Sequence, residues 1–205
     1  MKQVILKTLL VIAIISFNGC AMYYRPISPD KVNYNILENH DGIELSYRYD
    51  LLRERGNKKM AKKELANGIK IIAVRLTNNT DTIVTVGKNI AFFSGLNEIV
   101  PLEPLVVKNK VKQSVIGYLP YFLGAFGRST VTFNGRVVSS FPFGLFLWPG
   151  IAIGNMVVAN GANSNLLKEL REYDIVNMDI KPGETIYGII GVRDDSFVPL
   201  TIRRL

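Results

Sequence analysis

The chain has 205 residues with one cysteine, one histidine and a formal net charge of +8. A single histidine excludes the common histidine-based zinc sites, and a single cysteine excludes an internal disulfide. The basic residues are not interleaved with aromatic residues as they are in proteins that bind single-stranded nucleic acid, so the charge does not indicate nucleic-acid binding. A modest positive charge is typical of a protein that lies beside anionic lipid.

Residues 1–19 have the pattern of a secretory signal peptide. Two lysines accompany an apolar run from Thr8 to Phe17, which is too short to span a bilayer comfortably. The sequence Ser16-Phe17-Asn18-Gly19-Cys20 follows. It resembles the lipobox of bacterial lipoproteins, with Gly19 and Cys20 in the required positions. The alternative is a signal peptide that is cut elsewhere, which would leave Cys20 as a free thiol.

The lipobox resemblance implies cleavage before Cys20 and a lipid on its sulfur. Two or three acyl chains on one residue hold a protein durably at a membrane. Removing the two lysines of the signal peptide lowers the net charge from +8 to +6. Ala21 stands where inner-membrane lipoproteins commonly carry aspartate, so the resemblance implies a lipid-anchored protein on the periplasmic face of the outer membrane.

Residues 20–40 contain Pro26 and Pro29 and predict an extended tether. The folded domain is expected over 41–205. Its first strand is predicted at 43–49, where apolar and polar residues alternate. The basic segment 53–63 predicts a solvated loop or helical turn; a phosphate-binding patch for lipid head groups is the alternative.

Further short apolar segments separated by turn residues predict a mainly β domain. The expected elements are a hairpin of strands 69–76 and 82–86 around the turn 77–81, strands at 90–93 and 98–102, a turn at 180–185, and strands at 186–192 and 198–202. The segments 74–80 and Lys181-Pro182-Gly183-Glu184-Thr185 resemble the strand-turn features of immunoglobulin-like domains. The resemblance implies an immunoglobulin-like β-sandwich.

One stretch is unusual because only Arg128 and Arg136 are charged between Ser114 and Leu167. Two apolar halves, 115–127 and 137–159, flank a short strand and turn. The sequence therefore predicts a hydrophobic helical hairpin inserted into the sandwich at about 111–173.

Three interpretations of this hairpin stay open. The first half is too short for a membrane-spanning helix, and Pro142 and Pro149 interrupt the second. The hairpin can fill the domain core, lie in or dip into the leaflet beside the lipid anchor, or form an interface for an outer-membrane protein partner.

Two further patterns lie in its second half. Small residues predict a surface that another helix can approach closely. They are Gly150, Ala152, Gly154, Ala159, Gly161 and Ala162. Residues 163–173 predict an amphipathic surface helix leading back to the sandwich. Its apolar side holds Leu166, Leu167, Leu170 and Tyr173, and its polar side holds Lys168, Glu169, Arg171 and Glu172.

The mature sequence contains no G-x-S-x-G elbow and no phosphate-binding P-loop. His40 lies in a predicted turn, and the adjacent carboxylates Asp194 and Asp195 point apart on a strand or turn. We expect no enzyme activity, metal or cofactor. The favoured hypothesis is a non-catalytic structural or accessory component of an outer-membrane assembly. The alternative is a carrier of a hydrophobic ligand such as lipid, whose pocket would be lined by Tyr118, Tyr121, Phe122, Phe126, Phe141, Phe143, Phe146 and Trp148.

Overall fold

The computed structural model describes residues 19–34, 36–193 and 199–205. The predicted signal peptide up to residue 18 and the pair Asp194-Asp195 lie outside these residues. The described residues form two compact units, one from 19–23 and 113–162 and the other within 24–112 and 163–205. We call the first the hairpin unit and the second the sheet unit. The structure is mixed, 36% helical and 33% strand, so the expectation of a mainly β protein is corrected.

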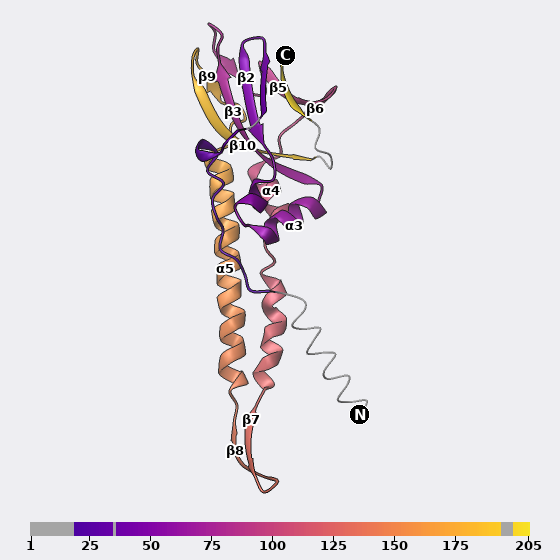
Figure 1. Ribbon diagram of the computed structural model, residues 1–205, viewed down its shortest axis with the longest axis vertical. Helices are drawn as coiled ribbons and strands as arrows, with labels where there is room; N and C mark the ends of the chain where they lie inside the picture. Colours follow the sequence, from indigo (N-terminus) through magenta and orange to yellow (C-terminus); the bar gives the residue numbers. More distant parts are fainter. Residues whose placement is uncertain (1–18, 35, 194–198) are drawn as a thin grey trace. The chain divides into compact units, whose positions relative to one another are not determined.

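The sheet unit contains three antiparallel sheets (Figure 1). The four-stranded sheet has the order β1 (Ile36–His40), β2 (Ile43–Arg48), β3 (Ile69–Asn78) and β10 (Thr185–Arg193). The three-stranded sheet has the order β11 (Leu200–Arg204), β5 (Ile90–Ser94) and β6 (Asn97–Ile99), and β4 (Val84–Thr85) pairs with β9 (Asp179–Ile180). Antiparallel sheets are confirmed, and they are not closed.

Short helices complete the sheet unit. They are η1 (Pro29–Lys31), α2 (Leu51–Glu54), α3 (Lys58–Ala66) and α4 (Pro104–Val111). The predicted basic segment 53–63 is therefore largely helical. The long helix α5 (Gly144–Glu172) begins in the hairpin unit and ends in the sheet unit. Its last turns confirm the predicted amphipathic helix, since Leu166 and Leu170 are buried.

The alternating pattern at 43–49 produces β2 as predicted, with Ile43, Leu45 and Tyr47 buried. The central strand β3 is buried along most of its length, which suits its nearly continuous apolar sequence. Side chains from both larger sheets, including Tyr47 and Phe92, belong to one hydrophobic core. The core also orders polar groups, because the Leu200 N–H donates to the Tyr47 hydroxyl at 3.0 Å.

The predicted hairpin of strands 69–76 and 82–86 is wrong. Strand β3 pairs with β2 and β10, whereas β4 pairs with β9. The buried Asn78 explains the divergence, because its Nδ2 donates to the carbonyls of Thr82 at 2.8 Å and Ile180 at 2.9 Å. These bonds turn the chain toward β9, so the next strand does not fold back on β3.

Helix α4 lies close to strand β10 at a glycine. A Cβ atom on Gly191 would lie 2.2 Å from Val107 Cγ2, far inside van der Waals contact. The Leu102 N–H also donates to the Gly191 carbonyl at 2.7 Å. Glycine at this position therefore allows the segment 102–107 to pack directly on the strand.

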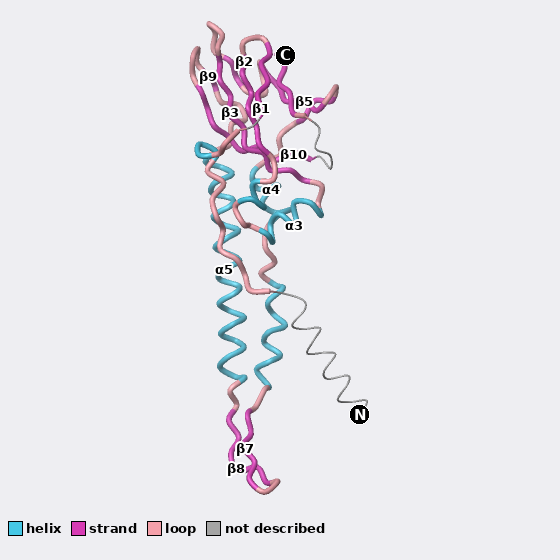
Figure 2. The backbone as a smooth tube through the Cα atoms, viewed as in Figure 1, coloured by secondary structure: helices cyan, strands magenta, loops and turns pink. Residues whose placement is uncertain are grey.

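The hairpin unit contains η2 (Ile116–Phe126), the strand pair β7 (Ser129–Phe133) and β8 (Arg136–Phe141), and the first part of α5 (Figure 2). The predicted hairpin exists, but its second arm is a strand as far as Phe141 before the helix begins. Asn134 and Gly135 both have positive φ (48° and 74°), as a two-residue turn between twisted strands requires. Gly124 lies against Trp148, where a Cβ would come within 2.4 Å of the indole.

Candidate functional site

The chain beside the predicted lipidation residue is fixed to the hairpin unit. Cys20 itself is exposed. The Ala21 N–H donates to Asn155 Oδ1 at 2.5 Å, on helix α5. The Met22 N–H donates to Gln113 Oε1 at 3.1 Å, and Gln113 Nε2 donates to the Met22 carbonyl at 2.6 Å. An acyl group on Cys20 would therefore start beside the apolar hairpin, one residue from a fixed position on α5.

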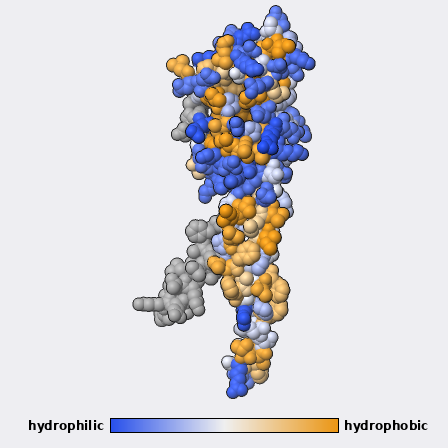
Figure 3. Space-filling view, turned by 180° about the vertical axis from the view of Figure 1, so that it is seen from behind, coloured by the Kyte–Doolittle hydropathy of each residue, from blue (hydrophilic) through white to orange (hydrophobic). Residues whose placement is uncertain are grey.

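Large apolar side chains cover the surface of the hairpin unit (Figure 3). Sixteen of them are exposed between residues 116 and 157: Ile116, Leu119, Phe122, Leu123, Phe126, Val131, Phe133, Val137, Val138, Phe141, Phe143, Leu145, Phe146, Leu147, Ile153 and Val157. Soluble monomers rarely expose contiguous apolar patches of more than a few hundred Å². The surface therefore has the chemistry of a site for lipid or for an apolar protein partner.

Helix α5 contributes much of this surface. Within the described part of the chain it is long and apolar enough to cross a membrane by length and composition, and only 17% of its most apolar window is buried. A core helix of a soluble protein would instead be mostly buried. The interpretation of the hairpin as filler of the domain core is therefore disfavoured by its exposure.

The eight aromatic residues proposed to line a carrier pocket separate into two groups. The buried Tyr118 and the partly exposed Tyr121 and Trp148 form a row with ring centroids 6.3 and 6.1 Å apart. The five phenylalanines are exposed, and Phe126 is 84% exposed. Three of the pockets in the described part of the chain are lined by other side chains. This arrangement favours contact with an external apolar phase.

The small residues of α5 also lie on two different faces. Ala152, Ala159 and Ala162 are buried. A Cβ placed on any of the three glycines, Gly150, Gly154 or Gly161, would have no neighbour within 4 Å. The predicted single small-residue surface is thus corrected: the alanines pack within the structure, and the glycines face open space.

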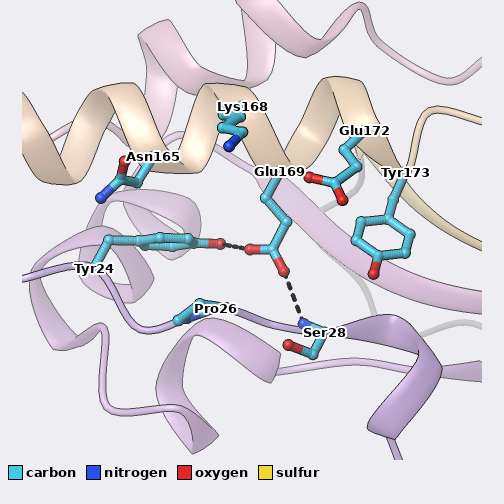
Figure 4. A pocket seen from close by; sticks show the side chains of 8 residues that line it. All are labelled: Tyr24, Pro26, Ser28, Asn165, Lys168, Glu169, Glu172 and Tyr173. Carbon is cyan, nitrogen blue, oxygen red and sulfur yellow. Dashed lines mark hydrogen bonds between the residues drawn. The ribbon is translucent and has the colours of Figure 1, made fainter.

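A second site surrounds Glu169, where α5 enters the sheet unit (Figure 4). The carboxylate accepts hydrogen bonds from the Tyr24 hydroxyl, from the Ile27 N–H at 3.1 Å and from the Ser28 N–H at 2.8 Å. A pocket of about 290 Å³ beside it is lined also by Pro26, Asn165, Lys168, Glu172 and Tyr173. The prediction that Glu169 lies on the solvated face of the helix is wrong, because segment 24–28 covers it.

The same segment is held from its other side by the basic helical region. Arg55 donates from Nε at 3.1 Å and from Nη2 at 2.8 Å to the Ile27 carbonyl. Asn57 forms two bonds with the Arg25 main chain, at 2.9 and 2.8 Å. The tether expected over 20–40 is therefore corrected: Ile27 is fully buried, and 36–40 is strand β1.

The electrostatics of Glu169 indicate a structural role. Burial and the adjacent carboxylate raise the pKa of Tyr24 far above its ordinary value, so the phenol stays protonated and remains a donor. The three donors converge on one carboxylate and occupy three of its roughly four lone-pair positions. The sequence did not predict this site, because Glu169 is 141–145 residues from the groups that donate to it. The presence of the apolar residues Tyr24 and Ile27 in a proline-containing segment was the only feature near that end of the chain that could have indicated burial.

A separate buried carboxylate, Glu64, lies on the inner face of α3. Desolvation raises its pKa to about 7, although the Ile71 N–H, which donates to Glu64 Oε1 at 2.7 Å, acts in the opposite direction. The fixed charges of Lys70 and Arg53 also lower it, and Asp50 raises it. Glu64 therefore has a pKa near neutral pH and accepts a hydrogen bond from the start of β3.

The predicted turn histidine is where the sequence places it. His40 ends β1, with its Nε2 at 3.2 Å from Asp41 and both side chains about half exposed. Among the described residues no group of three histidine, cysteine or acidic side chains could hold a metal ion. His40 thus lies at the surface with a single acidic neighbour.

No protein-family model, curated protein or solved structure matches this chain. Its function is therefore inferred from the hairpin unit, from Cys20 and from the site around Glu169.

Proposed function

We propose that this protein is a lipid-anchored, non-catalytic lipoprotein of the outer membrane, on its periplasmic face, and that it is a structural or accessory component of a membrane assembly. One observation carries the proposal. The residues that follow Cys20 are hydrogen-bonded to Asn155 and Gln113 in the hairpin unit, whose surface is apolar. The lipid and the apolar surface would then meet the same membrane.

The two attachments differ in strength and purpose. Acyl chains on Cys20 would hold the protein durably without specificity. The exposed apolar surface of the hairpin unit could contact either the bilayer or the lipid-facing side of an outer-membrane protein. The converging groups around Glu169 support the non-catalytic part of the proposal, since the carboxylate is occupied by three structural donors.

We also propose that the sheet unit is an immunoglobulin-like sandwich. The four-stranded and three-stranded sheets share one hydrophobic core, with contributions from β2, β3 and β10 on one side and β5 and β11 on the other. The turn Lys181–Glu184 supports the likeness, because the Lys181 N–H donates to the Glu184 carboxylate at 2.8 Å and Gly183 has a φ of 73°.

The test is purification of the native full chain in mild detergent, followed by mass spectrometry of the bound protein and lipid. Stoichiometric recovery of an outer-membrane barrel or assembly factor supports the accessory role. Recovery of a stoichiometric lipid by itself supports the alternative, a carrier of a hydrophobic ligand.

A matched pair of variants shows whether the hairpin unit makes the contact. Phe126→Ser removes a side chain that is 84% exposed in the hairpin unit, and Leu96→Ser removes one that is 87% exposed in the sheet unit. We expect only Phe126→Ser to reduce the recovered partner. Equal recovery with both variants would contradict the assignment of the contact to the hairpin. For the anchor, Cys20→Ala should release the protein from membranes on high-salt washing more readily than wild type.

A further inference from the structure

The orientation of the hairpin unit in lipid is constrained by its two arginines and its exposed strands. Arg128 lies at the start of β7 and Arg136 at the start of β8, and both are exposed. All eleven residues of the two strands are exposed as well. This inference rests on the proposed function, because it assumes that the unit meets a bilayer.

The position of Arg128 can be measured along α5 from the anchored end. From Asn155, which binds Ala21, to the start of the helix at Gly144 is about 16 Å at 1.5 Å per residue. The Gly144 N–H donates to the Gly127 carbonyl at 3.1 Å, so Arg128 lies at that level. If Cys20 marks the interface and the unit points straight inward, Arg128 reaches the middle of a hydrocarbon core about 30 Å thick.

Such a crossing orientation is unfavourable for two reasons. A charged arginine at the bilayer centre is disfavoured by roughly a hundredfold or more. In addition, β7 and β8 form a two-stranded sheet whose outer edges have no strand partner in the described chain. The unpaired backbone N–H and C=O groups along these edges would lie in hydrocarbon, which offers no hydrogen-bond partner, and burying each of them there is energetically unfavourable.

The strands have the side-chain pattern of a sheet that lies flat. Residues that face each other in the register, such as Thr130 with Ser140 and Val131 with Ser139, share a face. One face therefore carries the large apolar side chains Val131, Phe133 and Phe141, with Arg136 opposite Phe133 at the turn end. The other face carries the hydroxyls of Thr130, Thr132 and Ser140, with Val137 opposite Thr132 beyond the irregularity that follows Val131. A flat sheet buries the apolar side chains of the first face in acyl chains and exposes the second face to head groups. Arg136 lies at the turn end of the first face, where its long side chain can extend sideways to the phosphate level.

We infer that the hairpin unit lies in the plane of the leaflet that holds the Cys20 lipid, with Arg128 and Arg136 binding lipid phosphate groups. In this orientation both guanidiniums lie at the phosphate level, where arginine forms bidentate bonds. The free strand edges meet water and head groups. The acyl chains on Cys20 and the apolar face of the hairpin enter the same leaflet.

Depth-dependent quenching tests the orientation. The full lipidated chain carries one added cysteine, at Thr130, Val131 or Asn134. This cysteine labels cleanly, because Cys20 is the only native cysteine and a lipid joined to its sulfur by a thioether would block it. Each variant carries a bimane label in vesicles of phosphatidylethanolamine and phosphatidylglycerol. Nitroxides lie on the head group, near the top of the acyl chain or near its end.

We expect the Val131 label to be quenched most by the nitroxide near the top of the acyl chain. The labels at Thr130 and Asn134 should be quenched most by the head-group nitroxide. Strongest quenching of the Thr130 and Val131 labels by the chain-end nitroxide would overturn the in-plane orientation and leave the proposed function standing. No quenching of any label would also overturn the in-plane orientation, because the hairpin unit would then not contact the bilayer; recovery of a protein partner in detergent tests the proposed function separately.

A second pair of variants tests the arginine contact. Arg136→Leu should shift the Asn134 label deeper, so that head-group quenching falls and acyl-chain quenching rises. Arg136→Lys keeps a charge that can bind phosphate and should keep the label shallow. An identical quenching profile for both variants would overturn the assignment of Arg136 to the phosphate level.

Discussion

The three hydrogen bonds to Glu169 make the stability of the sheet unit depend on segment 24–28, which follows Cys20. Tyr24→Phe removes one donor to a charged acceptor and keeps the ring, so we expect a loss of about 2 kcal/mol. Glu169→Ala removes the acceptor of all three donors. The Ile27 N–H is then buried without a partner, whereas the half-buried Ser28 N–H can reach water from the pocket. We expect a total loss of about 4 kcal/mol.

Urea denaturation of the detergent-solubilised full chain, followed by circular dichroism, measures these losses. Glu169→Gln keeps an oxygen for Tyr24 and Ile27 and presents an amide donor to the Ser28 N–H, so its loss should lie between zero and that of Glu169→Ala. Glu172→Ala is the control, because Glu172 lines the same pocket and is exposed; its effect should stay below about 0.5 kcal/mol. The reasoning fails if Glu169→Ala costs no more than Glu172→Ala.

Three other predictions concern the sheet unit. Burial raises the pKa of Glu64 in the folded protein from 4.5 to about 7, so its contribution to stability is complete below pH 4.5 and is lost as the pH rises through 7. Relative to Glu64→Gln, the free energy of unfolding of the wild type should therefore fall by about 3 kcal/mol between pH 4.5 and pH 8, measured by urea denaturation at a series of pH values. Asn78→Ala removes the amide that donates to the buried Ile180 carbonyl and should cost about 1 to 3 kcal/mol by the same titration, while Asn79→Ala, at an exposed neighbour, should be nearly neutral. Gly191→Ala should lower the melting temperature, because its methyl group would overlap Val107, and Gly191→Ala with Val107→Ala should recover part of the loss; no recovery would contradict the overlap.

Local patterns predicted those elements whose environment follows from neighbouring residues. Alternation at 43–49 identified β2, since one face of a strand meets one core. The low charge between Ser114 and Leu167 likewise identified the hairpin, because a surface without charges differs from ordinary protein surface over a long stretch. These predictions needed no knowledge of distant partners.

The missed features all depend on contacts between distant residues. Turn residues after β3 indicated a local hairpin, but the Asn78 amide binds Ile180, 102 residues away, and this contact directs the chain elsewhere. Glu169 has the helical position of a solvated residue when α5 is considered in isolation. Its burial comes from Tyr24 and Ile27, which hydrophobic periodicity cannot connect to a helix at the other end of the sequence.

The double attachment of Ile27 has a practical consequence for work on the soluble part of this protein. The first residues after a lipidated cysteine are often removed as a dispensable linker. Here a chain shortened to begin at residue 29 would lack Tyr24 and Ile27, both buried, and would leave Arg55 without the carbonyl that it binds and Glu169 without its donors. Loss of the Ile27 side chain by itself removes about 1.5 to 3 kcal/mol of apolar burial. A soluble version of this protein should therefore begin no later than residue 23, because segment 24–28 is part of the packed fold.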